Sequence, residues 1–302
     1  MKIAVAATPD VAIPTLELIK KSRHSLELII TQPDRPAGRG NSMKQSAVSL
    51  WGDKNQISVI KAQSMDEIRA AIKDIDCVVT VAYGVILPIE VLGTPKHGFI
   101  NLHFSLLPKW RGAAPVQRCL EAGDKQTGVT VFKLDKGMDT GPLYLSKKID
   151  LLGTETSIDL FSQLSVIGAD AVLEALTLIE EGFHPTDQNS GGTSHAAKIT
   201  KDEALINWQR SSAEVDRQIR AFMQSPICWS TFRNEPLRIL SAEISDNESI
   251  KSGQIAVVDG RVLVGTSDFA LILKEVIPSG KRTMSAMEWA NGARFTPGEK
   301  LG

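Results

Sequence analysis

Two polar side chains stand near the end of an apolar run in the first half of the chain. Residues 98–103 read as a strand, and Asn101 and His103 lie two positions apart within it. Side chains at this spacing point to the same side of a strand, so the amide and the imidazole should project together at its carboxyl end, where open α/β sheets place their sites. An amide donates hydrogen bonds without titrating, and an imidazole moves protons near neutral pH. For His103 alone, a hydrogen-bonded histidine that merely ends a strand is the alternative.

A carboxylate further along the chain stands in a predicted tight loop. Asp139 lies within Gly137-Met138-Asp139-Thr140-Gly141, and the bracketing glycines allow the loop to present its side chain. Beside a histidine, a carboxylate orients the imidazole and stabilises its protonated form. On its own, an aspartate between glycines is more often a turn residue than a functional one.

Several common catalytic motifs are absent from the sequence. The turn after the first strand, residues 6–10, has no glycine, and Gly38-Arg39-Gly40 lacks the third glycine of a dinucleotide site. There is no Walker-type G-x-x-x-x-G-K and no G-x-S-x-G elbow. The cysteines, Cys77, Cys119 and Cys228, are far apart and form no C-x-x-C pair, so they indicate neither a zinc site nor a disulfide framework. The sequence therefore indicates none of these common sites.

The elements that must position these side chains alternate between strands and helices. Apolar runs predict strands at residues 2–6, 26–31, 76–82 and 98–103, and helical periodicity predicts helices at residues 11–20, 65–73 and 156–181. Asp10 and Ser64 precede two of these helices as expected N-caps. Such alternation predicts right-handed βαβ units, hence an α/β fold with a Rossmann-like, mostly parallel sheet.

The character of the chain changes in its last third. A polar stretch rich in Pro, Asp, Asn, Ser and Gly predicts a linker at residues 185–205, between domains at residues 1–184 and 206–302. Beyond it, a helix is expected at residues 213–222. Short strands separated by glycine and Asx turns follow, at residues 229–232, 237–240, 254–258, 261–266 and 270–276. This spacing predicts a small β-barrel.

The charge balance limits the classes of partner. Lys and Arg number 34 against 35 Asp and Glu, so indiscriminate nucleic-acid binding is not expected, although a local basic patch could still hold an RNA. Residues 33–44 form such a segment, with Arg35, Arg39 and Lys44 among prolines and glycines. Its composition fits a mobile loop that orders on an RNA backbone, or a surface loop without function.

Features that the sequence lacks lead to expectations about the location and the oligomeric state of the protein. No run approaches the ~18 apolar residues of a membrane span, and the first residues do not resemble a secretory signal. We therefore expect a cytoplasmic protein that does not enter a membrane. A monomer is the default, because the pattern shows no exposed apolar stripe.

The motifs taken together resemble a known family. The matching residues are Asn101-x-His103-x-Ser105-Leu106-Leu107-Pro108, Trp110-Arg111-Gly112-Ala113-Ala114-Pro115 and Met138-Asp139-Thr140-Gly141. They are similar to those of folate-dependent formyltransferases, most closely those that act on initiator methionyl-tRNA. Further matching stretches cover nearly the whole chain, at residues 31–40, 81–88, 197–203, 219–222 and 295–298.

The resemblance implies substrates and roles. The formyl donor would be 10-formyltetrahydrofolate, and the acceptor would be the α-amino group of methionine on initiator tRNA. Asn101, His103 and Asp139 would form the catalytic group. The segments that would border the folate contain Ser105, Leu106, Leu107, Pro108, Tyr83 and Gly84. Arg39, with Arg35 and Lys44, would contact the tRNA, and a C-terminal barrel of the oligonucleotide-binding type would hold the rest of it. No metal is implied.

The sequence departs from the family pattern in places, and it leaves other functions open. Phe104 stands where a glycine is usual, so its ring would either narrow the pocket or point away from it. Met223-Gln224-Ser225 replaces a common Asn-Pro-Trp. The alternatives are formyl transfer to an amino sugar nucleotide or another small amine, hydrolysis of formyltetrahydrofolate by water, and a non-catalytic RNA-binding module.

Overall fold

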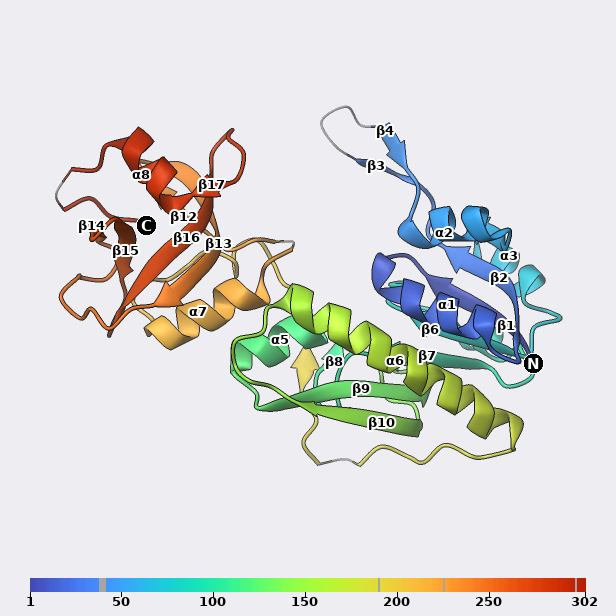
Figure 1. Ribbon diagram of the computed structural model, residues 1–302. Helices are drawn as coiled ribbons and strands as arrows, with labels where there is room; N and C mark the ends of the chain where they lie inside the picture. Colours follow the sequence, from blue (N-terminus) through green and yellow to red (C-terminus); the bar gives the residue numbers. More distant parts are fainter. Residues whose placement is uncertain (38–41, 190, 225, 297) are drawn as a thin grey trace. The chain divides into compact units, whose positions relative to one another are not determined.

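A computed structural model of the chain describes residues 1–37, 42–189, 191–224, 226–296 and 298–302. The chain forms two compact units (Figure 1). Unit 1 comprises Met1–Pro115, Gln126–Asp150 and Phe161–Ala196, and unit 2 comprises Val116–Lys125, Leu151–Leu160 and Ala197–Gly302. The two units alternate along the sequence. The domain boundaries expected after residues 184 and 205 stay predictions.

Unit 1 is built on a seven-stranded sheet with the order β10-β9-β7-β6-β1-β2-β5. Its strands are β1 (Lys2–Ala7), β2 (Ser25–Thr31), β5 (Ser58–Lys61), β6 (Cys77–Val81), β7 (Phe99–His103), β9 (Gln126–Lys133) and β10 (Leu143–Asp150). The pairs from β5 to β7 are parallel, and β9 and β10 are antiparallel. Strands β1 and β6 are apolar runs buried on both faces, as parallel strands between helices must be. The predicted mostly parallel α/β sheet is confirmed.

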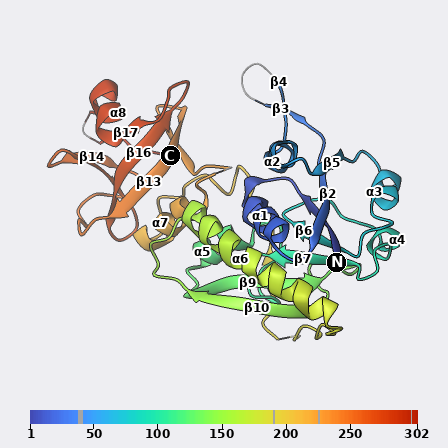
Figure 2. The same ribbon diagram turned by 45° about the vertical axis from the view of Figure 1, so that its right-hand side comes forward.

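Helices cover both faces of this sheet (Figures 1 and 2). On one face lie α1 (Ile13–Lys21), α2 (Ala47–Asn55) and α6 (Ser157–Glu180), and on the other lie α3 (Met65–Ala71) and α4 (Ile89–Leu92). Gly168 of α6 lies so close to Leu102 that a Cβ there would come within 2.6 Å of its side chain. On the opposite face, Ile68 and Val91 join an apolar cluster with Val78 of β6.

One of the two expected N-caps is present in the structure and the other is not. Ser64 caps α3, because its side chain accepts a hydrogen bond from the backbone N–H of Glu67. Asp10 does not cap α1, so that expectation was wrong. Instead, Asp10 begins a 3₁₀ turn, η1 (Asp10–Ala12), and α1 starts at Ile13 with Pro14 in its first turn. Proline suits this position because its fixed φ is already helical and the first-turn N–H groups lack helical partners anyway.

Helix α6 corrects the expectation that no stretch approaches a membrane span. It has 24 residues, and an 18-residue window within it has a mean hydropathy of 1.4, which is long and apolar enough to cross a membrane by length and composition. Half of that window is buried within the protein. Leu164 and Leu176 are fully buried. Packing in the protein core therefore explains the apolar composition of α6, because core helices of globular proteins pass the same test.

Unit 2 contains a six-stranded antiparallel sheet, with the order β12-β13-β16-β15-β14 and β17 paired with β16. The strands are β12 (Trp229–Phe232), β13 (Glu235–Ile244), β14 (Ile255–Val258), β15 (Arg261–Gly265), β16 (Ala270–Pro278) and β17 (Met284–Ser285). Its helices include α5 (Pro115–Ala122), α7 (Ser212–Ala221) and α8 (Ala286–Ala293). In the described part of the chain β12 and β14 are not paired, so the predicted small β-barrel is an open, curled antiparallel half-barrel.

Candidate active site

Strand β7 presents Asn101 and His103 on the face of the sheet opposite α6. Leu102, between them, packs against Gly168 of α6, and alternation along a strand puts its neighbours on the other face. Phe104 also turns towards α6, where its ring packs edge-on against Phe161 with centroids 5.7 Å apart. The ring that replaces the usual glycine therefore points away from His103 and leaves the site open.

A buried threonine fixes the orientation of the Asn101 amide. Thr80 on β6 lies directly opposite Asn101 in the parallel register, and its hydroxyl donates to Asn101 Oδ1 over 2.7 Å. The same hydroxyl lies 3.1 Å from the carbonyl oxygen of Ile100. With Oδ1 engaged as an acceptor, the NH₂ group of Asn101 is the part of the side chain left to donate to a substrate.

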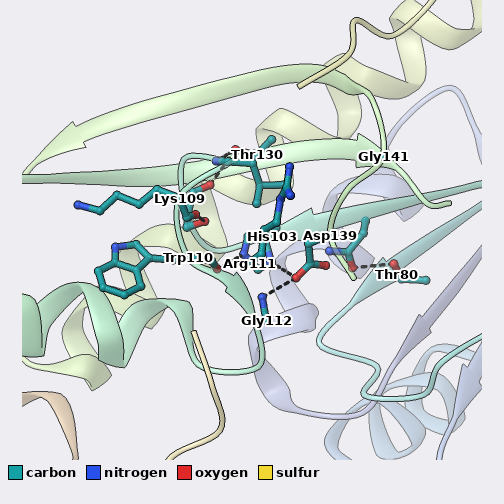
Figure 3. Close-up of polar contacts among 12 residues, drawn as sticks. Thr80, His103, Lys109, Trp110, Arg111, Gly112, Thr130, Asp139 and Gly141 are labelled. Atoms are coloured by element: carbon teal, nitrogen blue, oxygen red, sulfur yellow. Dashed lines mark hydrogen bonds and ion pairs between the residues drawn. The ribbon is translucent and has the colours of Figure 1, made fainter. Parts of the chain in front are cut away.

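The carbonyl of Trp110 fixes the tautomer of His103. Nε2 lies 2.8 Å from that carbonyl oxygen, so Nε2 carries the hydrogen and donates it (Figure 3). Nδ1 of the neutral ring then has a free electron pair, and it lies 3.7 Å from Oδ2 of Asp139. Burial lowers the pKa of His103, whereas Asp139 and the Trp110 carbonyl raise it in part. The net lowering keeps the imidazole neutral near pH 7, with Nδ1 as its basic atom.

Asp139 is held in the predicted tight loop, with a left-handed φ of 53°. Its Oδ2 accepts a hydrogen bond of 2.7 Å from the backbone N–H of Gly112, and Figure 3 shows the carboxylate between that N–H and His103. Both bracketing glycines are required by close approaches. A Cβ at Gly137 would lie 2.0 Å from Oγ1 of Thr140, and one at Gly141 would lie 1.8 Å from the carbonyl oxygen of Lys133.

The segment that carries Trp110 and Gly112 is held by residues from the expected linker. Strand β8 (Arg111–Gly112) pairs in parallel with β11 (His195–Ala196), and the N–H of Trp110 donates to Oγ of Ser194 over 2.9 Å. Gly112 has a φ of 125°, and a Cβ there would lie 2.7 Å from the carbonyl oxygen of Ala196. The two groups that fix His103 and Asp139 are therefore set by this two-stranded sheet.

The expected folate segment follows β7 directly. Ser105 is buried, and its hydroxyl donates to the carbonyl oxygen of Lys109 over 2.6 Å. Thr130 on β9 accepts from the N–H of Leu107 at 3.1 Å and donates to the carbonyl of Ser105 at 2.7 Å. Leu107 is buried, and Leu106 and Pro108 are half-buried. The segment is thus tied to the sheet by its backbone.

The other expected folate residues, Tyr83 and Gly84, lie in the loop after β6. The Tyr83 ring belongs to the apolar cluster on the α3 side of the sheet, and its burial raises the pKa of the phenol. The Tyr83 carbonyl accepts a hydrogen bond of 2.7 Å from Nε2 of Gln32. Gly84 has a φ of 71°, which glycine adopts without strain. The tyrosine side chain therefore serves the core, and the loop backbone is the part held near Gln32.

The expected tRNA-binding residues lie on a hairpin of β3 (Arg35–Ala37) and β4 (Ser42–Lys44). Figures 1 and 2 show it projecting from unit 1 beside α2. Arg35 and Lys44 are exposed and face each other in the antiparallel register, and Arg35 also donates to Oε1 of Gln32. Arg39 lies outside the described residues. Beneath the hairpin, Lys61 and Asp34 form an ion pair of 2.8 Å.

Sequence reasoning missed the groups that hold the candidate catalytic side chains. These are the Thr80 hydroxyl, the Trp110 carbonyl, the Gly112 N–H and, as described below, the side chain of Gln188. A polar residue in the otherwise apolar run 77–81 was a usable signal for Thr80. The backbone groups leave no such signal, because any residue carries them.

Comparisons with known proteins agree over the whole chain. The family described as "Formyl transferase" matches residues 1–176, and the one described as "Formyl transferase, C-terminal domain" matches residues 198–294. A relative from Salinispora tropica, named methionyl-tRNA formyltransferase, is 40% identical over 309 residues that cover 100% of both chains.

Solved structures share the fold at lower identity. An N-formyltransferase from Helicobacter canadensis, in complex with folinic acid and dTDP-3-aminofucose, superposes with a TM-score of 0.68 and 21% identity, covering 90% of this chain and 98% of that one. A HypX variant from Aquifex aeolicus superposes with a TM-score of 0.72 and 15% identity. This chain is covered to 99% in that match but spans only 49% of the HypX chain.

In this Rossmann-like sheet an amide, a histidine and a carboxylate meet where strand β7 ends. The chain belongs to the formyl transferase family. Within that family, its full-length similarity is to proteins named methionyl-tRNA formyltransferase.

Proposed function

We propose that this protein transfers the formyl group of 10-formyltetrahydrofolate to the α-amino group of methionine on initiator methionyl-tRNA. The observation that carries the proposal is the assembled group of Asn101, His103 and Asp139. It occurs in a chain that is 40% identical, from end to end, to relatives named for this activity. A non-catalytic RNA-binding module would have no need of this buried, hydrogen-bonded arrangement.

The Asn101 amide fits a formyl group. Because Thr80 occupies Oδ1, the NH₂ group is oriented as a donor that does not titrate. The donor, when bound, supplies a formyl carbon on N10 for attack by the amine. Negative charge then develops on the formyl oxygen, and a preoriented N–H group stabilises that charge without reorganising. Ser105 to Pro108, whose backbone is tied to Thr130, are proposed to border the folate.

We assign His103 the role of base, with Nδ1 as the acceptor of the proton that the attacking amine must lose. In the neutral ring Nε2–H is engaged by Trp110, so Nδ1 has no hydrogen to give to an oxyanion and can only accept one. Oδ2 of Asp139, 3.7 Å away, stabilises the imidazolium that forms. As the bond between the formyl carbon and N10 breaks, the imidazolium returns its proton to N10, and tetrahydrofolate leaves as a neutral amine. The Trp110 carbonyl, rather than Asp139, orients the ring.

The Asp139→Asn substitution is predicted to move the pH profile. Asp139 raises the pKa of His103 against the effect of burial, so its removal lowers that pKa further. Protonation of Nδ1 then occurs at lower pH, and the acid limb of kcat/KM shifts to lower pH. The plateau rate falls about 10- to 100-fold, because the imidazolium loses an ion-pair partner. A pH–rate profile that overlays that of the parent would remove Asp139 from the mechanism.

Arg39→Ala tests the hairpin as the part that holds the tRNA. We expect KM for methionyl-tRNA to rise and the slope of log affinity against log salt to decrease by about 1, because one phosphate contact is lost. Binding of the folate donor should be unchanged. Lys54→Ala on α2, an exposed lysine of the same unit, is the matched control. Equal losses in tRNA and folate binding would contradict an RNA-contacting role.

Two alternatives differ only in the acceptor. One structural neighbour is an N-formyltransferase in complex with dTDP-3-aminofucose, although at 21% identity it shares the fold alone. Consumption of 10-formyltetrahydrofolate should therefore be measured with water alone, with an amino sugar nucleotide and with initiator methionyl-tRNA. Consumption that depends on the tRNA supports the proposal. Turnover with water alone would indicate a hydrolase, and turnover with the sugar nucleotide a small-amine transferase.

Location and assembly complete the proposal. We place the protein in the cytoplasm, as a monomer that does not enter a membrane. In the described residues no group of three or more His, Cys, Asp or Glu side chains is arranged to hold a metal ion.

A further inference from the structure

Gln188 reaches the catalytic loop from a segment that composition alone marks as a linker. Its Nε2 donates to the carbonyl oxygen of Asp139 over 2.9 Å and to that of Gly141 over 2.8 Å. Both hydrogens of one amide are thereby used on carbonyls two residues apart. These bonds hold the backbone of Asp139, the residue whose carboxylate faces His103.

The guanidinium of Arg111 sets the orientation of the Gln188 amide. Nε and Nη2 of Arg111 donate to Oε1 of Gln188 at 3.2 and 2.6 Å. Because Arg111 has donors only, the amide must turn its oxygen to the arginine and its NH₂ group to the loop. Arg111 lies between Trp110 and Gly112, which bond His103 and Asp139 respectively. A single network therefore fixes the histidine, the carboxylate and the loop backbone.

The segment that carries Gln188 is anchored on both sides of it. Thr186 and Leu143 exchange backbone hydrogen bonds of 2.7 and 2.8 Å just after the Asp139 loop. Further on, Ser194 accepts from the N–H of Trp110 at 2.9 Å. The side chain of Gln188 is half-buried between these anchors. Gln188 is therefore held to the two site loops by its neighbours as well as by its own amide.

We propose that Gln188 is a positioning residue, which holds the left-handed Asp139 loop so that the carboxylate faces the imidazole during formyl transfer. This inference rests on the proposed function. A non-glycine residue with a φ of 53° is costly by itself and persists only when its surroundings hold it. At the start of the loop, the Asp135 carboxylate accepts hydrogen bonds from the Gly137 N–H and the Thr140 hydroxyl. Gln188 holds the other side of the loop.

Two substitutions separate positioning from folding. Gln188→Leu removes both donors, and Gln188→Glu keeps the size and the Arg111 contact but turns a carboxylate towards two carbonyl oxygens. Both variants should lower kcat by about 10- to 100-fold, since small displacements of a reacting group have effects of this size. KM for the folate donor should stay within about twofold, because no folate contact is assigned to Gln188. Gln63→Leu, the same change at an exposed position, is the control and should retain the parent rate.

The titration of His103 distinguishes positioning from a general structural effect. Among the described residues, Asp139 is the charged group that faces the ring, and it raises the pKa of His103. If Gln188 holds Asp139 in place, the pKa of His103 must fall in Gln188→Leu, and the acid limb of kcat/KM must shift in the same direction. Gln188→Glu adds a carboxylate to the network, so that variant is judged by its kcat and not by the pKa of His103. The chain has five histidines, so the His103 resonance can be assigned with His103→Gln and followed by NMR in the free protein.

The outcomes separate this inference from the proposed function. Lower kcat and a lower His103 pKa, with no further pH shift when Gln188→Leu is added to Asp139→Asn, support positioning. Parent-like kcat in either variant, or an unchanged His103 pKa in Gln188→Leu, overturns it. If Gln188→Leu does not fold, the kcat of Gln188→Glu decides. A parent protein that forms no formyl-methionyl-tRNA refutes the proposed function instead, and the NMR titration still tests the inference.

Discussion

His103→Gln is expected to lower kcat by about 10²- to 10⁴-fold, the range that a positioned general base contributes. Glutamine retains an Nε2 donor that can still reach the Trp110 carbonyl, so the buried hydrogen bond is preserved. It has no basic atom at the position of Nδ1, 3.7 Å from Oδ2 of Asp139. The substitution therefore removes the base and keeps the structural contact. Single-turnover rates with saturating donor and tRNA give the effect directly.

Folate binding and thermal stability are the controls for this substitution. Folate binding and the midpoint of thermal unfolding should remain close to those of the parent. A residual rate within about tenfold of the parent would show that His103 acts only as a structural histidine at a strand end.

Asn101→Ala is expected to cost about 3–4 kcal/mol of transition-state stabilisation, which is a decrease of about 10²- to 10³-fold in kcat. The alanine removes the NH₂ donor that Thr80 orients and that we propose for the formyl oxygen. Because the charge develops only in the transition state, KM for either substrate should change little. Asn55→Ala on α2 is the matched control and should leave kcat unchanged. A large rise in donor KM at constant kcat would mean that Asn101 binds the ground state instead.

The alternation of side chains along a strand predicted that Asn101 and His103 lie together in the site. Asn101 and His103 share a face because the period of a strand is two, and this does not depend on the rest of the fold. The tight loop that presents Asp139 was likewise predicted from its bracketing glycines, Gly137 and Gly141. The meeting of Asp139 with His103 was not visible in the spacing. It depends on the Gly112 N–H, and the resemblance to a family supplied it.

Helix starts depend mainly on the residues next to them in the sequence, and one of the two predicted N-caps was correct. Ser64 caps α3 as expected, whereas Pro14 and a 3₁₀ turn displaced the helix start predicted after Asp10. The polar segment around Gln188 has the composition of a linker, and nothing in that composition indicates its contacts with the site loops. Its ordered contacts are with Asp139 and Arg111, which are distant in sequence. No local pattern encodes such contacts, because they arise only once the sheet has brought the loops together.

The most direct test of this account is the product formed by the purified parent protein from 10-formyltetrahydrofolate and methionyl-tRNA. We predict formyl-methionyl-tRNA from the initiator species, little from methionyl elongator tRNA, and none when His103→Gln replaces the parent at the same concentration. Release of the folate with no formylated tRNA would contradict the account, and the acceptor would then have to be a small amine or water.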